Sequence, residues 1–138
     1  MDRTARQLID RLGLAPLPVE GGWFRSLWRS ADGAACSCIH YLLRAGEVSR
    51  WHRLSSDEVW TWHAGGSLEM TRGGDGPRPG AGRTVRLGPR PGEDFAAAVP
   101  AGAWQTTRVA DGAFALVSCV VAPAYRDEDC EFLPEEDV

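Results

Sequence analysis

The sequence contains no lysine and no asparagine. Without lysine, a protein cannot form a lysine Schiff base with a carbonyl substrate or hold pyridoxal phosphate covalently on a lysine. Without asparagine, it offers no acceptor for N-linked glycans. Basic residues are also outnumbered, because the net charge is −4 and the isoelectric point is about 5.3. We therefore expect no nucleic-acid partner, since surfaces that bind nucleic acid are strongly basic.

Long apolar runs are missing as well, and none approaches the roughly 20 residues needed to cross a bilayer. The first six residues lead into an amphipathic stretch rather than into an apolar signal region. We expect a cytoplasmic protein with no membrane partner. The length of 138 residues, with 43% hydrophobic and 25% charged residues, fits one soluble globular domain.

Cysteines are few and do not form two close pairs. Cys36 and Cys38 lie two apart in a strand-like segment, so they share a face and are poorly placed to bridge one another. Cys119 and Cys130 are distant in sequence. A zinc site would be supported by a second closely spaced pair. We therefore expect reduced, mostly buried thiols.

The chain is rich in short aromatic and β-branched runs separated by glycine, proline and aspartate, a pattern typical of an all-β sandwich or barrel. One short helix is predicted over residues 4–12, with Thr4 as its cap and Gly13 as its end. Asp32-Gly33 and Asp111-Gly112 predict hairpin turns. Strands are predicted over residues 22–29, 35–43, 48–54, 57–63, 67–72, 84–87, 94–99, 104–109 and 113–121.

We interpret residues 1–138 as a single domain. The N-terminal helix occupies residues 1–14, the barrel residues 15–125 and an acidic tail residues 126–138. The glycine- and proline-rich stretch 73–83 is predicted to be a loop, because it carries no phosphate-binding fingerprint. The tail is expected at the surface, with Phe132 and Leu133 docking back.

A fixed-interval pattern between Gly46 and Gly65 carries the candidate chemistry. His52 follows the first glycine by six residues, Glu58 follows His52 by six, and Gly65 follows Glu58 by seven. Alternate residues of a strand face the same side, so His52 and Glu58 can converge inside a barrel, with Leu54 facing in beside His52. On the Glu58 strand, Trp60 and Trp62 share its parity. Burial against aromatic rings would raise the pKa of Glu58 and equip it as a general acid or base.

A second segment, Val99-Pro100-Ala101-Gly102-Ala103-Trp104-Gln105, can turn a strand back over this pair. This segment resembles the second conserved motif of the cupin superfamily, and the resemblance implies that Gln105 lies with His52 and Glu58, so that these three residues are the possible ligands if a divalent metal is present. One histidine, one carboxylate and one amide make a thin shell for a transition metal. A metal site therefore stays possible, but no cofactor is the expectation.

These two segments resemble the two conserved motifs of the cupin superfamily. Leu54 stands where the first motif has its second histidine, and Gln105 stands where the second motif has its histidine. The resemblance narrows to the cupin 5 family, also called DUF985, whose members are described as predicted sugar epimerases. It rests on five segments that span nearly the whole chain: Pro18 to Arg25, Ser49 to Arg53, Ser56 to Trp60, Val99 to Gln105, and Val120 to Pro123.

The resemblance implies a double-stranded β-helix, the cupin jelly-roll barrel, generally as a homodimer with a deep pocket. The chain departs from the family at Val19, at His40 and at Ala124-Tyr125. The last two departures add groups that can transfer protons.

Cupin sugar epimerases work without metal, with a histidine base, a carboxylate partner and a tyrosine acid. Carried over by resemblance, these roles fall on His52, Glu58 and Tyr125. The expected substrate-binding residues are Gln105, Trp60, Trp62, His40 and Arg25.

Three functions remain open from the sequence. The first is an isomerase, epimerase or lyase that acts by metal-independent proton transfer on a small carbonyl-containing or sugar-like substrate. The second is a non-catalytic module that binds a small hydrophobic or aromatic ligand. The third is a metal-dependent cupin enzyme.

Overall fold

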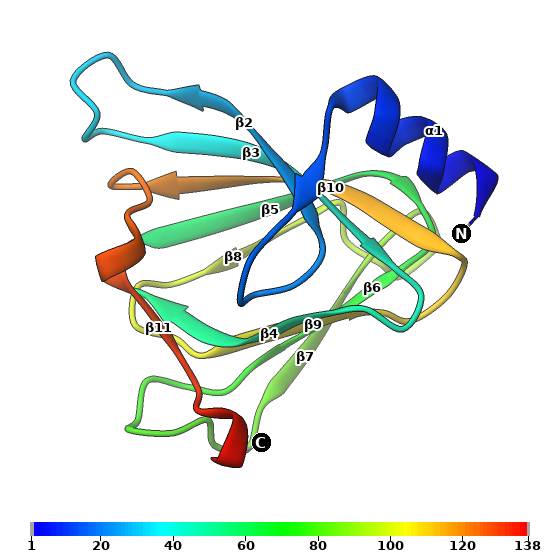
Figure 1. The fold of residues 1–138 in the computed structure, drawn as a ribbon. Coiled ribbons are helices and arrows are strands. Elements are labelled where there is room, and N and C mark those ends of the chain that lie inside the picture. Colours follow the sequence, from blue (N-terminus) through cyan, green and yellow to red (C-terminus); the bar gives the residue numbers. More distant parts are fainter. Residues whose placement is uncertain (1, 138) are drawn as a thin grey trace.

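The aromatic and β-branched runs fold into two antiparallel sheets that face each other (Figure 1). The structure is a computed structural model that describes residues 2–137. One sheet has the strand order β1-β2-β3-β10-β5-β8 and the other the order β11-β4-β9-β6-β7. The bounds are β1 Ala15–Pro16, β2 Trp23–Arg29, β3 Ser37–Arg44, β4 Val48–Leu54, β5 Asp57–Gly65, β6 Leu68–Arg72, β7 Arg83–Leu87, β8 Ala96–Val99, β9 Gln105–Val109, β10 Phe114–Ala122 and β11 Cys130–Phe132.

This arrangement is the jelly-roll barrel that the sequence predicts, and each of the nine expected strands is present. The sequence analysis missed β1 and β11, which pair with β2 and β4. Strands of two or three residues are too short to show an alternating pattern. Because β11 belongs to the second sheet, part of the expected tail is built into the barrel wall.

Alternate residues of both sheets meet between them and form the core. Tyr41, Leu43 and Trp60 enter from the six-stranded sheet, and Leu68 and Met70 from the facing one. Each of these side chains is at most 1% exposed, so the barrel has a packed interior at this level. Burial of apolar surface on this scale is the main term that stabilises the fold.

Helix α1, Arg3–Leu12, packs on the outer face of the six-stranded sheet. Ala5 and Ile9 are its buried residues, and they contact the cluster that contains Leu42 of β3. The expected cap Thr4 is wrong. Asp2 is the N-cap and accepts a hydrogen bond from the backbone N–H of Ala5 at 3.0 Å, which aspartate does as well as threonine.

The expected end of α1 is confirmed, since Gly13 has the left-handed backbone that ends helices (φ 66°). Two short 3₁₀ turns, Asp127–Asp129 and Glu135–Asp137, lie near the C-terminus. Within residues 2–137, no helix combines the length and the apolar character that a membrane crossing requires.

The two expected hairpins differ in outcome. Asp32-Gly33 lies in the connection between β2 and β3, which are paired antiparallel strands. The expected hairpin at Asp111-Gly112 is wrong, because this turn joins β9 to β10 and these strands belong to different sheets. The local residue signal marks a turn but does not say whether the next strand pairs with the last. Residues 73–82 form the expected loop.

The C-terminal segment docks as expected. Leu133 is buried, and Phe132 is partly buried with its ring 5.6 Å from the ring of His52. This contact brings the end of the chain to the back of the imidazole.

Candidate functional site

A cavity of about 140 Å³ lies at one end of the barrel, between β4 and the inner face of the six-stranded sheet. Its wall combines apolar side chains with polar and titratable ones. The apolar members include Leu17, Phe24, Ile39, Leu54 and Val121, and the polar ones include Glu20, Arg29, Tyr41, His52, Glu58 and Tyr125.

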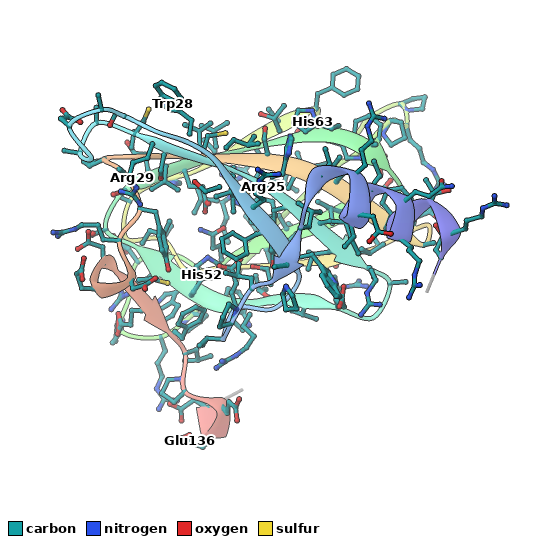
Figure 2. The ribbon with its side chains drawn as sticks, turned by 45° about the horizontal axis from the view of Figure 1, so that its top comes forward. Arg25, Trp28, Arg29, His52, His63 and Glu136 are labelled. Carbon is teal, nitrogen blue, oxygen red and sulfur yellow. The ribbon has the colours of Figure 1, made fainter. Side chains whose placement is uncertain are left out.

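His52 of β4 projects into this cavity, as Figure 2 shows, and its residue is only 2% exposed. The ring atom Nδ1 lies 2.6 Å from the backbone oxygen of Arg50. A carbonyl oxygen only accepts hydrogen bonds, so Nδ1 carries a hydrogen and donates it. In the neutral ring, Nε2 therefore has the free lone pair, and this atom is available as a base.

Glu58 of β5 reaches the same cavity from the opposite sheet. β4 and β5 belong to different sheets and do not pair, so their side chains approach each other across the interior. Burial raises the pKa of Glu58, and the nearby charge of Glu20 also raises it, against opposing effects of His52 and Gln105. The raised pKa favours the neutral acid, which is the form that can donate a proton.

Gln105 holds Glu58 in place without lining the cavity. Its Nε2 donates to Oε1 of Glu58 at 2.8 Å, while its Oε1 accepts from the indole N–H of Trp60 at 3.2 Å. An indole nitrogen only donates, so this contact also determines which end of the amide faces Glu58. The expected ligand contact of Gln105 is thus replaced by a positioning contact.

Glu20 is a titratable member that the sequence analysis did not assign. Its Oε2 accepts from the hydroxyl of Ser49 at 2.8 Å, and its Oε1 lies 3.8 Å from Nε2 of His52. The only feature of the sequence that could have pointed to Glu20 as a site residue is its position before two glycines. Gly21 has a positive φ of 99°, and the phenol of Tyr41 donates to the carbonyl oxygen of Gly21 at 2.6 Å. The tight turn that places the Glu20 carboxylate in the cavity depends on this conformation of Gly21.

Tyr125 lines the cavity. Burial raises the pKa of its phenol, and the neighbouring Cys130 and Asp127 raise it further. The phenol therefore stays protonated and can donate a hydrogen bond. Its backbone N–H donates to the hydroxyl of Ser37 at 2.9 Å, which fixes the segment at the cavity wall.

The two expected tryptophans do not line the cavity. Trp60 faces inward with Glu58, as strand alternation predicts, but it lies in the core against the ring of Tyr41, with the ring centroids 5.7 Å apart. Trp62 stacks near Phe95, and its indole N–H donates to the backbone oxygen of Gly66 at 2.9 Å. The alternation of residues along the strand predicted which face of the sheet Trp60 and Trp62 occupy. It did not predict how far along the barrel they lie.

His40 and Arg25 lie away from the cavity as well. They are opposite each other in the β2–β3 register, and His40 makes an edge-on contact with the ring of His63 on the outer face of the sheet. Figure 2 places His63 and His52 on opposite sides of this sheet. Arg25 donates to the backbone oxygen of Leu12 at 3.4 Å and so ties β2 to the end of α1.

The cavity also contains a buried thiol, that of Cys119. Cys119 lines the wall, but burial and the charges of Glu58 and Glu20 raise the pKa of its thiol well above the usual value. The neutral thiol reacts poorly. Cys36, Cys38, Cys119 and Cys130 are all free, but the expectation of mostly buried thiols is wrong, because only Cys119 is buried and the other three are partly exposed.

The donor set does not fit a cupin metal centre. Leu54 offers no donor atom, and the amide oxygen of Gln105 is already bonded to Trp60. Among the described residues, no group of three histidine, cysteine, aspartate or glutamate side chains is arranged to hold a metal ion. We therefore derive no chemical step through a metal.

Comparisons with known proteins agree on the fold. Residues 6–133 match a family described as Cupin superfamily (DUF985). A structure of a protein from Shewanella oneidensis is 36% identical, with a TM-score of 0.88 over 96% of this chain and 86% of that one. A hypothetical protein from Leishmania major is 33% identical, with a TM-score of 0.85 over 96% of this chain and 88% of that one.

More distant structures share the fold alone. An oxalate decarboxylase from Bacillus subtilis is 14% identical, with a TM-score of 0.65 over 87% of this chain and 30% of that one. No curated protein matches the chain.

Proposed function

This chain belongs to the DUF985 family of the cupin superfamily, and from that premise we propose that its cavity is the active site of an enzyme that enolises a small carbonyl compound. One observation carries the proposal. A buried imidazole with its Nε2 free and a carboxyl group whose raised pKa favours the neutral acid line the same small cavity from opposite sheets. A base and an acid on two sides of one carbonyl are what enolisation requires.

The proton-transfer step uses these two residues. Nε2 of His52 takes a proton from the carbon next to the carbonyl, and the C–H electron pair becomes the C=C bond of the enol. The carbonyl π electrons move to its oxygen, which takes the proton of Glu58. The Glu20 carboxylate, 3.8 Å from Nε2 of His52, stabilises the imidazolium that forms.

The direction of proton return determines the reaction type. Return to the opposite face of the same carbon is epimerisation, with Tyr125 as the donor on that side. Return to the former carbonyl carbon is isomerisation, and loss of a group from the next carbon is elimination. The enzyme is thus an isomerase, epimerase or lyase.

The cavity volume limits the substrate. A cavity of about 150 Å³ in another protein holds benzene, and this cavity measures about 140 Å³. The size favours a small carbonyl compound or a single sugar-like ring over a complete nucleotide sugar.

Deuterium exchange tests the proposal. The purified protein is incubated in D₂O with dihydroxyacetone, cyclohexanone and 2-oxobutyrate, and loss of the protons next to each carbonyl is followed by NMR. We expect accelerated exchange for at least one compound, abolished in His52→Ala and strongly reduced in Glu58→Gln, with circular dichroism confirming that both variants fold. Exchange that is equal with and without the protein, or equal in both variants, contradicts it.

Ligand binding without chemistry is the second candidate, and the apolar part of the wall favours it. Leu17, Phe24, Ile39, Leu54 and Val121 would accommodate a hydrophobic ring. A compound that stabilises the protein and is recovered without exchange supports this candidate.

We further propose a cytoplasmic homodimer. Four free cysteines suit a reducing compartment. On the outer face of the six-stranded sheet, Trp28, Cys38, Val120 and Val59 follow one another in register, and Trp28 is 62% exposed. Such an apolar row suits contact with a second copy. Light scattering should give twice the chain mass, and the monomer mass for Trp28→Glu.

A further inference from the structure

An irregularity in β2 changes which of its side chains enters the cavity. The β2–β3 register pairs Ser26 with Ile39 and Trp28 with Cys38, so Leu27 is an extra residue without an opposite partner. This is a β-bulge, which reverses the alternation of the strand beyond it. Without it, the inward series that includes Ser26 would continue with Trp28.

With the bulge, Arg29 continues the inward series instead. Arg29 is opposite Ser37 in the register, and both residues line the cavity, as do Ser26 and Ile39. Trp28 is turned to the outer face, where Figure 2 shows its ring pointing away from the barrel. Arg29 is the only arginine that lines this cavity among the described residues.

The Arg29 guanidinium is held in place but not neutralised. It donates to the backbone oxygen of Gly33 at 3.2 Å and to that of Tyr125. Among the described residues, no carboxylate lies within ion-pair distance of it. Two of the five N–H donors of a guanidinium are thus used, and three remain.

We propose that Arg29 binds the carboxylate of the substrate, which makes the substrate a small oxo acid. A planar guanidinium with free donors binds a carboxylate through two parallel hydrogen bonds. Arg29 is exposed while it lines the cavity, so it would hold the carboxylate at the solvent-accessible edge of the cavity. Burial raises the pKa of Glu58, which disfavours its negative charge beside such an anion. The substrate class rests on the proposed function, with the carbonyl between His52 and Glu58.

A matched pair of ligands tests the assignment: 2-oxobutyrate and its amide, which differ in the carboxylate alone. Titration followed by NMR gives the Kd of each for the wild type, Arg29→Gln, Arg29→Lys and Arg72→Gln. Arg72 is the control, because its guanidinium also donates to a backbone oxygen, that of Ala98, and does not line the cavity.

We expect the wild type to bind the acid about tenfold or more tightly than the amide. Arg29→Gln should lose this preference, Arg29→Lys should keep part of it, and Arg72→Gln should keep all of it. Equal binding of acid and amide by the wild type, no binding of the acid, or a preference that survives in Arg29→Gln overturns the assignment. If Arg29→Gln does not fold, the test rests on the Kd values of the acid and the amide for the wild type and for Arg29→Lys.

Deuterium exchange at carbon 3 of 2-oxobutyrate separates this inference from the proposed function. Binding of the acid through Arg29 without exchange contradicts the proposed enolisation and leaves the carboxylate site intact. Exchange with unchanged acid affinity in Arg29→Gln contradicts the carboxylate site and leaves the enolisation intact.

Discussion

The amide of Gln105 donates a hydrogen bond to the carboxyl group of Glu58 across 2.8 Å, and both side chains are buried. Because the same amide accepts from Trp60, two strands share one polar chain inside the barrel: β5 through Trp60 and Glu58, and β9 through Gln105. Every link in this chain has one donor and one acceptor. Its removal should therefore affect stability and chemistry together.

The first prediction concerns Gln105→Leu. The change leaves the indole N–H of Trp60 and the carboxyl group of Glu58 without their partner in the interior, so we expect a loss of about 2 kcal/mol in the free energy of unfolding. Urea unfolding measures this loss. In the wild type, the amide hydrogen bond lowers the pKa of Glu58. Without it, the deuterium-exchange rate of the substrate should begin to fall at a higher pH than in the wild type. An unchanged unfolding midpoint would show that the chain is not formed.

The second prediction concerns pH and Glu58. Burial raises its pKa in the folded state above the unfolded value, so the folded protein binds the proton more tightly. The contribution of Glu58 to the free energy of unfolding is fully present below its pKa in the unfolded chain. It is lost as the pH rises through its pKa in the folded protein. Glu58→Gln keeps the shape without the ionisation. We expect the difference in unfolding free energy between Glu58→Gln and the wild type to shift in favour of the variant between pH 4.5 and neutrality.

The control for this pH series is an acid on the surface. Glu136 is exposed, and Figure 2 places it at the far end of the C-terminal turn. Glu136→Gln should follow the wild type across the same pH range. A Glu58→Gln curve parallel to the wild type would contradict the raised pKa.

The third prediction concerns the donor set. Leu54 shares a face with His52 and lines the cavity, so Leu54→His adds a second imidazole beside the first. We expect this variant to bind Co²⁺ or Zn²⁺ roughly 100-fold more tightly than the wild type, because imidazole suits both metals. Calorimetric titration measures the affinity. Leu54→Gln is the control of similar size, and equal metal affinity in Leu54→His and the wild type would refute the prediction.

The fourth prediction concerns the turn that carries Glu20. Val19 has a positive φ of 68°, a conformation that is costly for a β-branched residue, and its side chain is 60% exposed. Val19→Gly removes this strain, and we expect a gain of about 1 kcal/mol in unfolding free energy. Val48→Gly is the matched control, because Val48 is also exposed but lies in β4. There we expect a loss of roughly 0.5–1 kcal/mol, and a loss at both positions would argue against strain at Val19.

Much of the barrel was readable from local patterns. The alternation of apolar and polar residues located the nine longer strands, and strand parity placed His52 beside Leu54 and Glu58 beside Trp60 on inward faces. The resemblance to the family motifs then implied the jelly-roll barrel, and the structure supplied the order of the strands. These features depend on near neighbours in the chain, which a sequence displays directly.

The residues that line the cavity were harder to predict from the sequence. Glu20 enters from a turn, where side chains follow no period, and Arg29 enters because of one bulge at Leu27. Arg25, four residues earlier on the same strand, was the arginine expected to bind substrate, but it lies on the outer face of the sheet. Trp60 and Trp62 have the expected parity, but the cavity ends before it reaches them.

The amino-acid sequence by itself determined the all-β barrel, the positions of most strands, and the presence of an inward histidine and an inward carboxylic acid. Strand periodicity and glycine-marked turns are local, and they need no knowledge of what lies across the barrel. Only the tertiary structure decided that Glu20 and Arg29 join His52 and Glu58 in one cavity and that Gln105 serves Glu58. Those contacts join residues far apart in the chain, and they depend on a bulge, a tight turn and the packing of two facing sheets.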